Sequence, residues 1–354
     1  MLPKRDYASK PASGRVHVVC VEFGATYRHG NGHNLAAQLS SCGRAYGFQT
    51  SYLPQPDRAP VWPSVPVGSE MAHLIVVAGT AFDERLVDAV AERLDSWTSA
   101  SIAFAYGTRA AMLAAEPRVE AWKVKAGPRL NFLFPDVVAD DGRWTVSVQK
   151  IIDNAVCDTV RVKYQPVQNA RDVELPVPVL AYFERASRLY AEEGLYLRAP
   201  TDGYFAMRWG GGFFITATFT DKIQLDPARI SLVHGYERAS GTLQYSGRYL
   251  PSSDAVEAAI LLAQRTDYDY LLHTHASRLF TRNPAFRVRA LVPPMAYGEP
   301  ELGDALVAAL AQVPDGFVIM AEHGDLFAGS GDMADFIEGV RRRCVEARHA
   351  TPAE

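Results

Sequence analysis

The residues best suited to chemistry are two histidines, His273 and His275, at the end of the apolar segment Tyr270–His275. Side chains at positions i and i+2 of a β-strand point to the same face, so both imidazoles can bind one metal ion. A third histidine, His323, follows the apolar run Phe317–Ala321 and precedes a glycine. Three imidazoles on one side of an ion leave positions open for a substrate, as a catalytic site requires. The alternative is that the pair is simply exposed and His323 is a turn residue.

The elements that must position these histidines belong to the second of two predicted domains. After an N-terminal tail, residues 1–14, short apolar runs alternate with helical patterns over residues 15–165. This alternation predicts a Rossmann-like, three-layer α/β domain with a mostly parallel sheet. Residues 166–178 contain prolines and lack periodicity, which predicts a linker, and residues 179–348 form the second α/β domain. First-domain strands are predicted at 16–23, 49–53, 74–78, 102–106 and 132–138, with helices at 34–46 and 83–97.

The second domain is predicted to contain a helix over Val179–Glu193 that ends at Gly194, because glycine is the usual C-terminal stop. Another predicted helix begins at Asp254, directly after Pro251-Ser252-Ser253. Further strands are predicted at 213–218, 270–275, 287–292 and 317–321, and helices at 254–266, 301–311 and 331–348.

Two glycine-containing loops are the main candidates for function in the first domain. Gly24–His33 lies between the first strand and helix, and Tyr106–Arg109 follows another strand. Such loops can place backbone N–H groups around an anion, although neither has the spacing of a nucleotide-binding motif. The alternative is a mobile turn that is rich in glycine and histidine. A second metal pair, His29 and His33, is less expected because no third ligand is evident nearby.

Composition excludes several classes of protein. The chain has 354 residues, of which 48% are hydrophobic and 21% charged, and its formal net charge is −4. This mild acidity argues against nucleic acid or a polybasic membrane surface as a partner. No apolar run reaches the roughly 18 residues that a membrane-spanning helix needs. The four cysteines are scattered without a CxxC pair, which is typical of a reducing, cytoplasmic compartment.

The order of motifs in residues 178–347 resembles that of the class II aldolase/adducin family. The matching segments are Gly194-Leu195, Phe214–Thr218, Pro251–Asp254, His273–Ser277, Tyr297-Gly298 with Glu301-Leu302, and His323-Gly324. The resemblance implies a three-layer α/β/α unit and a homotetramer with sites between neighbours. It also implies that His273, His275 and His323 hold a divalent ion, usually Zn²⁺, with Asp254 as the acid/base carboxylate. Three histidines with open positions can also hold Fe²⁺ or Mn²⁺.

The same resemblance places a substrate-binding group on Thr218, Ser252, Ser253 and Arg208, where family members bind phosphate. Three positions depart from the pattern: Tyr204 replaces an asparagine, Ala206 replaces a serine and Phe219 replaces a glycine. These aromatic residues weaken the case for a small phosphorylated sugar and can instead stack on a ring or line an apolar pocket. Phosphate remains possible through Arg208, Lys222 and the serines.

The stretch that carries the proton-donating tyrosine of the family aldolases holds no tyrosine before Tyr297. Tyr297 is therefore either the proton donor or a structural aromatic residue.

Three functions follow from these observations. The favoured one is a metal-dependent lyase acting on a hydroxy-carbonyl compound, by aldol or retro-aldol chemistry or by decarboxylation. The second is a metal-dependent epimerase, because the epimerase branch of the family has the same Ser-Ser-Asp sequence as Ser252–Asp254. The third is a non-catalytic binding or scaffold protein, a role against which the three retained histidines argue. A small-molecule substrate and a homo-oligomer are the expected partners.

Overall fold

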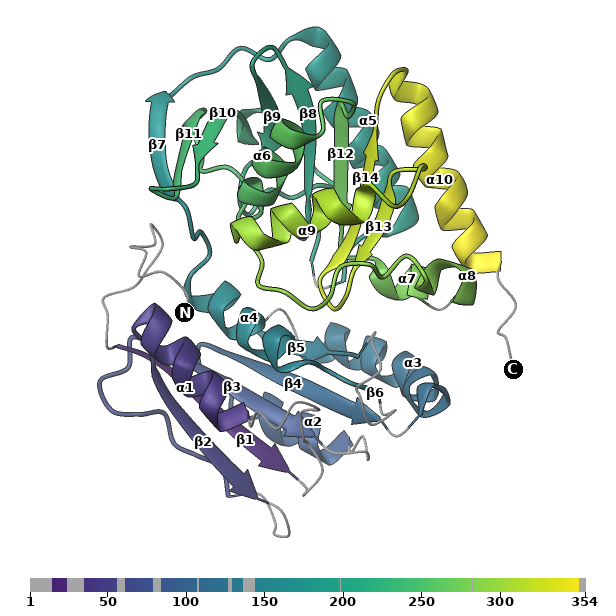
Figure 1. The fold of residues 1–354 in the computed structure, drawn as a ribbon. Coiled ribbons are helices and arrows are strands. Elements are labelled where there is room, and N and C mark those ends of the chain that lie inside the picture. Colours follow the sequence, from purple (N-terminus) through teal and green to yellow (C-terminus); the bar gives the residue numbers. More distant parts are fainter. Residues whose placement is uncertain are drawn as a thin grey trace. The chain divides into compact units, whose positions relative to one another are not determined.

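A computed structural model describes residues 15–23, 35–55, 61–78, 84–106, 108–126, 129–135, 144–197, 199–281 and 283–349. The chain divides between Arg161 and Val162 into two compact units, each with its own sheet (Figure 1). Within the described residues, no helix is long and apolar enough to cross a membrane.

The first unit has a central sheet of parallel strands in the order β2-β1-β3-β4-β5. These strands are β1 (Val16–Phe23), β2 (Gln49–Gln55), β3 (Met71–Ala78), β4 (Ser99–Tyr106) and β5 (Leu130–Leu133), and β6 (Trp144–Thr145) pairs antiparallel with β4. Apolar residues run almost without interruption through β1 and β3 because both faces of a parallel sheet are covered. The predicted mostly parallel sheet is confirmed.

Helices cover both faces of this sheet. The helices are α1 (Leu35–Tyr46), α2 (Glu84–Ala91), α3 (Arg109–Ala126) and α4 (Val148–Thr159). Val90 of α2 and Val119 of α3 pack in one cluster with Ile102 of β4. Ser101 directly precedes Ile102 in β4, so its side chain points to the other face of the sheet. There Ser101 contacts Asn154 of α4, which shows that α4 covers this opposite face. Helices α3 and α4 were not predicted, and the helix predicted over 83–97 ends at Ala91.

The second unit is built on an eight-stranded sheet in the order β13-β14-β12-β8-β9-β10-β11-β7. All its neighbouring strands are antiparallel except β11 and β7. The strands are β7 (Gln165–Ala170), β8 (Tyr204–Trp209), β9 (Gly212–Thr216), β10 (Ile230–Glu237), β11 (Thr242–Ser246), β12 (Tyr270–Thr274), β13 (Phe317–Met320) and β14 (Gly324–Gly329).

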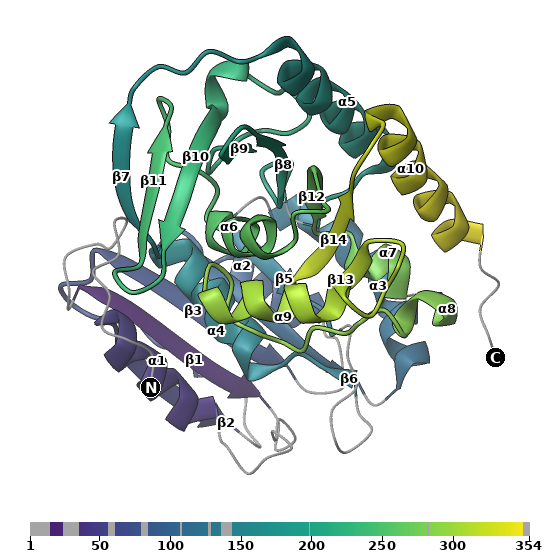
Figure 2. The same ribbon diagram turned by 45° about the horizontal axis from the view of Figure 1, so that its top comes forward.

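This sheet lies between two helical layers, so the unit has the predicted three-layer α/β/α arrangement (Figure 2). Leu271 of β12 packs on the side of α6 (Ala255–Gln264) and α9 (Pro300–Leu310), whereas Leu272 packs on the side of α5 (Val177–Glu193) and α10 (Met333–His349). Alternate residues of one strand thus enter two separate cores.

Three sequence predictions for this unit differ from the structure. The predicted linker 166–178 begins with β7, an edge strand that tolerates Pro166 because one side of an edge strand needs no backbone partner. The segment 287–292 is not a strand, because Asn283 and Pro284 start the short helix α8 (Pro284–Arg287) and only Val292 makes a β-bridge. Strands β8, β10, β11 and β14 were not predicted.

Two short helices complete the described part of the second unit. Helix α7 (Ser277–Thr281) follows β12, and the 3₁₀ turn Pro227–Arg229 precedes β10. Helix α5 ends as predicted at Gly194, which adopts the left-handed conformation with φ 64° and donates its N–H to Tyr190 O.

Candidate metal centre

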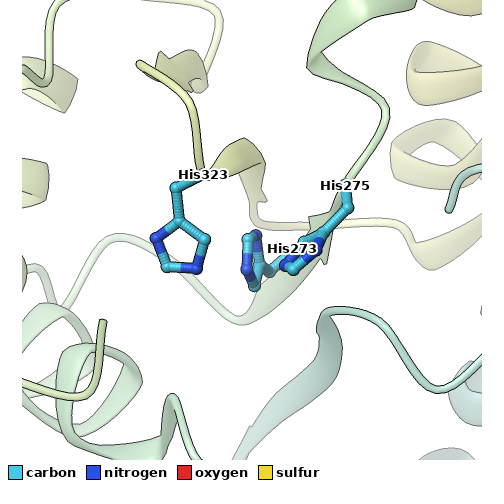
Figure 3. A group of neighbouring side chains, drawn as sticks. All are labelled: His273, His275 and His323. Atoms are coloured by element: carbon cyan, nitrogen blue, oxygen red, sulfur yellow. The ribbon is translucent and has the colours of Figure 1, made fainter. Parts of the chain in front are cut away.

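The three histidines come together at one edge of the second sheet. His273 is in β12, His275 follows its end, and His323 lies in the turn between β13 and β14. Because neighbouring strands here are antiparallel, β12 ends where β14 and β8 begin, with His273 opposite Tyr204. Figure 3 shows the three side chains side by side in this region.

The geometry of the three rings suits a single ion. One ligand nitrogen from each histidine lies within 4.8 Å of the other two. The ring centroids are 5.0 Å apart for His273 and His275, 5.0 Å for His273 and His323, and 5.4 Å for His275 and His323. Nitrogens on one tetrahedral zinc ion are about 3.3 Å apart, given a Zn–N distance of about 2.0–2.1 Å. The three rings would therefore have to move closer together to bind the same ion.

His273 is held in the tautomer that a metal ion requires. Its Nδ1 lies 2.8 Å from the backbone oxygen of Asp325, and a carbonyl can only accept, so Nδ1 carries the hydrogen. The lone pair is then on Nε2, which is buried and has no hydrogen-bond partner among the described residues. Burial lowers the pKa of His273, although the charge of Asp254 opposes the shift. A neutral, oriented imidazole with an unshared lone pair fits a divalent ion.

Asp325 fixes the strands that carry the histidines. Its side chain is fully buried, and its Oδ2 accepts hydrogen bonds from the Thr274 hydroxyl at 2.7 Å and the Ala276 N–H at 3.0 Å. These two residues flank His275. Asp325 therefore ties β14 to both sides of one histidine and, through its carbonyl, to the ring of another. The sequence did not lead us to predict this supporting role for Asp325. Its position two residues after a candidate metal ligand, His323, could have indicated it.

Glycine is required beside the rings at two positions. A Cβ on Gly324 would lie 2.1 Å from the carbonyl oxygen of Thr274 and 3.0 Å from atoms of both His273 and His275. A Cβ on Gly203, whose φ is +72°, would lie 2.2 Å from the carbonyl oxygen of His273. Both contacts involve backbone atoms that cannot rotate away, so these glycines allow the close approach of the strands.

Asp254 faces the histidines instead of capping its own helix. It occupies the N-cap position of α6, where an aspartate usually accepts a backbone N–H, but its side chain makes no cap hydrogen bond. The side chain is buried, and its Oδ2 lies 3.9 Å from His273 Nε2. Ser252 Oγ accepts the N–H of Asp254 at 3.3 Å and so helps to orient this segment. The predicted acid/base carboxylate and the predicted metal ligands are therefore adjacent.

Four of the predicted substrate-binding residues lie near this edge. Tyr204 is buried, and its ring centroid is 5.1 Å from that of His273. Burial raises the pKa of Tyr204, and the charges of Glu257 and Asp254 add to the shift, so the phenol stays neutral. The buried Ser252 and Ser253 directly precede Asp254, and the N–H of Thr218 donates to Leu250 O at 2.9 Å.

Phe219 also lies just beyond the end of β9, with 58% of its surface exposed. Its φ of +57° is a left-handed conformation that residues with a Cβ seldom adopt. The backbone at Phe219 therefore has a conformation that glycine adopts readily, at the position where the family resemblance leads one to expect glycine.

The hydrogen bonds of Arg208 lie at the end of α6. Arg208 lies four residues along β8 from Tyr204, and its guanidinium donates to the carbonyls of Leu262, Arg265 and Tyr268 at 2.7 to 2.9 Å. Two of these carbonyls are at or next to the C-terminus of α6, where unsatisfied backbone oxygens attract cations. The structure gives Arg208 a capping role, and its part in substrate binding stays a prediction.

A buried charged cluster that was not predicted lies behind Asp254. Glu257 is one helical turn further along α6, and its Oε1 accepts the N–H of Gly298 at 3.1 Å. Lys163, which is fully buried, donates to Tyr297 O at 2.6 Å and lies 3.7 Å from Glu299. The Lys163 ammonium is also 4.0 Å from the centre of the Tyr297 ring. This contact supports the interpretation of Tyr297 as a structural aromatic residue.

The Gly24–His33 loop of the first unit lies outside the described residues, and of Tyr106–Arg109 only Gly107 does. Residues 24–34, which include the Gly24–His33 loop with His29 and His33, and residue Gly107 are among those that the structure does not describe.

Comparisons with known proteins give matches among solved structures. No protein-family model matches the sequence, and no curated protein matches it. An L-fuculose 1-phosphate aldolase matches with 19% identity and a TM-score of 0.38, over 51% of this chain and 91% of that chain. L-fuculose-1-phosphate aldolase from Thermus thermophilus matches with 16% identity and a TM-score of 0.38, over 49% and 94%. YgbL from Escherichia coli matches with 17% identity and a TM-score of 0.37, over 47% and 86%.

Proposed function

We propose that this protein is a metal-dependent lyase of the class II aldolase type. It would cleave or form a carbon–carbon bond in a hydroxy-carbonyl, sugar-like substrate, by aldol or retro-aldol chemistry or by decarboxylation. The observation that carries the proposal is the convergence of three histidine nitrogens within 4.8 Å, beside the Asp254 carboxylate. Asp254 is buried beside the imidazoles and does not cap its own helix. A binding or scaffold protein would not require this arrangement.

His273, His275 and His323 are the residues that would hold the ion. Three imidazoles suit Zn²⁺, and Fe²⁺ or Mn²⁺ also bind such donor sets. A bound divalent ion would polarise the substrate carbonyl and stabilise the negative charge that develops on its oxygen.

Asp254 is proposed to move the proton. Its carboxylate is buried and faces the space next to His273, so it can accept a proton from a substrate bound there and return it to the product. Ser252, Ser253 and Thr218 carry hydroxyl groups that can orient the hydroxyls of the substrate. The buried ring of Tyr204 lies next to that of His273, where it would exclude water.

Metal analysis of the purified protein tests this proposal. Wild-type protein should contain about one divalent ion per chain, and His273→Ala should contain almost none, since three ligands are the usual minimum for a catalytic site. His234→Ala is the matched control, because His234 is a surface residue of the same unit that pairs with Ser246 at 2.8 Å. Equal metal content in wild type and His273→Ala would refute the metal centre.

The reaction is tested by product analysis with unphosphorylated and phosphorylated hydroxy-carbonyl sugars. A lyase yields two shorter fragments, and Asp254→Asn should abolish them while metal content and folding stay unchanged. An unaltered rate in Asp254→Asn would contradict the role of this carboxylate and favour a non-catalytic protein.

A metal-dependent epimerase is the second candidate, and the Ser252-Ser253-Asp254 sequence favours it. This enzyme would interconvert sugar epimers without producing fragments. We also propose a homotetramer, which light scattering of the purified protein can test.

A further inference from the structure

Several tyrosine side chains of the second unit are almost completely buried. Those that are at most 1% exposed are Tyr164, Tyr182, Tyr190 and Tyr204. The hydroxyl groups of the first three donate hydrogen bonds to the main-chain carbonyls of Pro251, Leu271 and Asp202, at 2.7 to 2.8 Å. These three residues follow the general rule that the hydroxyl of a buried tyrosine has a hydrogen-bond partner.

Tyr204 differs from these three residues. Among the residues that the structure describes, the hydroxyl group of Tyr204 has no hydrogen-bond partner. A buried hydroxyl without a partner costs free energy, because it has left water and gained no hydrogen bond in return. The presence of this hydroxyl therefore needs an explanation other than the stability of the fold.

The position of Tyr204 connects it with the candidate metal centre. Tyr204 lies opposite His273 in the register of β8 and β12, and directly opposed residues of neighbouring strands point to the same face. The centroids of the two rings are 5.1 Å apart. On this face Tyr204 belongs to the same cluster as Ala255 and Ala258, in the first turn of α6. The tyrosine ring is therefore beside a predicted metal ligand and beside the start of the helix that Asp254 precedes.

Two carboxyl groups lie near the Tyr204 hydroxyl without a hydrogen bond to it. Burial raises the pKa of Tyr204, and the charges of Glu257 and then Asp254 add to the shift, which places both groups close to the phenol. Glu257 Oε2 is itself buried and has no partner among the described residues. Even the ordinary pKa of a phenol is about 10, so Tyr204 keeps its hydrogen at neutral pH. The side chain therefore presents an O–H donor.

The space that a substrate would occupy is within reach of this donor. Asp254 Oδ2 and His273 Nε2 are 3.9 Å apart, and Tyr204 lies near both residues. A hydroxy-carbonyl compound that binds an ion at His273 through one oxygen has its neighbouring oxygen close to Asp254. An oxygen in this position can accept a hydrogen bond from the phenol.

We propose that Tyr204 is a substrate-binding residue whose hydroxyl donates a hydrogen bond to an oxygen of the hydroxy-carbonyl substrate. This inference rests on the proposed metal-dependent function. Because the hydroxyl gives up no hydrogen bond with the protein when the substrate binds, the new hydrogen bond contributes to affinity. It also selects for an oxygen at this point of the substrate, since a methylene group there would leave the buried hydroxyl unpaired.

Tyr204→Phe tests the proposal, because it keeps the ring and removes only the hydroxyl. Tyr182→Phe is the matched control: Tyr182 is equally buried, but it packs on the other face of the sheet and has a protein partner, Leu271 O. The first measurement is urea denaturation in the presence of a chelator. Tyr204→Phe should unfold at the wild-type midpoint or above it, whereas Tyr182→Phe should unfold at a lower urea concentration.

The second measurement is calorimetric titration of the zinc-loaded protein with glycolohydroxamic acid, a chelator of divalent ions that has one free hydroxyl group. Tyr204→Phe should bind this probe about tenfold more weakly than wild type, which corresponds to one hydrogen bond of about 1.4 kcal/mol. Tyr182→Phe should bind the probe as tightly as wild type. Zinc content should be equal in all three proteins.

The proposal is overturned if Tyr204→Phe loses as much stability as Tyr182→Phe, because the hydroxyl would then have a partner within the protein, such as Glu257. It is also overturned if Tyr204→Phe binds the probe as tightly as wild type, or if zinc-loaded wild type does not bind the probe. All three results would leave the metal centre itself intact. If wild type and His273→Ala contained the same amount of zinc, the proposed function would fail instead.

Discussion

Asp325 offers the sharpest test of how the candidate metal centre is supported, because it is buried and does not belong to the predicted ligand set. The perturbation is Asp325→Ala. It removes the acceptor of two hydrogen bonds, from the Thr274 hydroxyl at 2.7 Å and the Ala276 N–H at 3.0 Å. The backbone carbonyl that orients His273 remains, so any effect on metal binding must come through the position of β14 relative to His275.

The magnitude follows from these two contacts. Hydrogen bonds to a charged group contribute about 1.5–3 kcal/mol each to the free energy of unfolding. The alanine variant no longer buries a carboxylate, which offsets part of the loss, so we expect a net destabilisation of about 3 kcal/mol. Loss of a partner that orients a metal ligand typically weakens metal binding by about 10–100-fold. We expect zinc affinity to fall by about tenfold or more.

Two measurements check this expectation. Urea denaturation in the presence of a chelator gives the free energy of unfolding without metal, and competition with a chromophoric chelator gives the zinc affinity. Thr274→Val is the matched variant, because it removes only one of the two hydrogen bonds and keeps the shape of the side chain. It should cost about half as much as Asp325→Ala, and the double variant should be less destabilised than the sum of both.

The reasoning is wrong if Asp325→Ala binds zinc within twofold of the wild-type affinity while remaining within about 1 kcal/mol of its stability. Strict additivity of the two variants would also contradict it, since it would mean that Thr274 and Asp325 do not interact.

Three further predictions concern neighbouring residues. Gly324→Ala should abolish zinc binding in a metal assay, because its Cβ would lie 2.1 Å from Thr274 O; normal zinc content would refute the packing. Phe219→Gly should leave the unfolding free energy unchanged or raise it by up to about 1 kcal/mol, because it relieves a left-handed φ of +57° at a largely exposed residue. Burial, helped by the charge of Asp254, raises the pKa of Glu257, so its folded form keeps a proton that the unfolded chain has lost above about pH 4.3. Wild-type stability should fall as pH rises from there, by up to about 1.4 kcal/mol per pH unit, whereas Glu257→Gln should lack this loss. A constant difference between the two at pH 5 and pH 8 in urea denaturation would contradict it.

Local sequence pattern was sufficient for elements that are buried on both faces or have a clear stop signal. Strand β1 coincides with the predicted Val16–Phe23, and α5 ends at Gly194 as predicted. Both follow from rules that act over a few residues: continuous apolar runs in covered parallel strands, and glycine where φ is positive. The same short-range rule predicted that His273 and His275 share one face, although β12 ends at Thr274 and His275 follows it.

The local hydrophobic pattern was insufficient where a strand forms only by pairing with strands that are distant in the sequence. Strand β10 has an exposed second half, and β7 is largely exposed, so neither shows the apolar run that marked the predicted strands. Their pairing depends on distant neighbours in the chain, such as Thr242, which lies opposite Gln165. The hydrogen-bond partners of a side chain are equally difficult to predict from the sequence. The carbonyl groups that accept hydrogen bonds from Arg208, for example, lie 54 to 60 residues later in the chain.

Residue types and spacing thus indicated two of the three candidate ligands, because His273 and His275 are related by the two-residue period of a strand, which needs no knowledge of the fold. Only the tertiary structure brought His323 within 4.8 Å of them and turned the Asp254 carboxylate toward His273. It also revealed the carboxylates of Asp202 and Asp325 behind the rings. These features depend on the antiparallel register of β8, β12 and β14, which is set by packing across the whole sheet and not by any single segment.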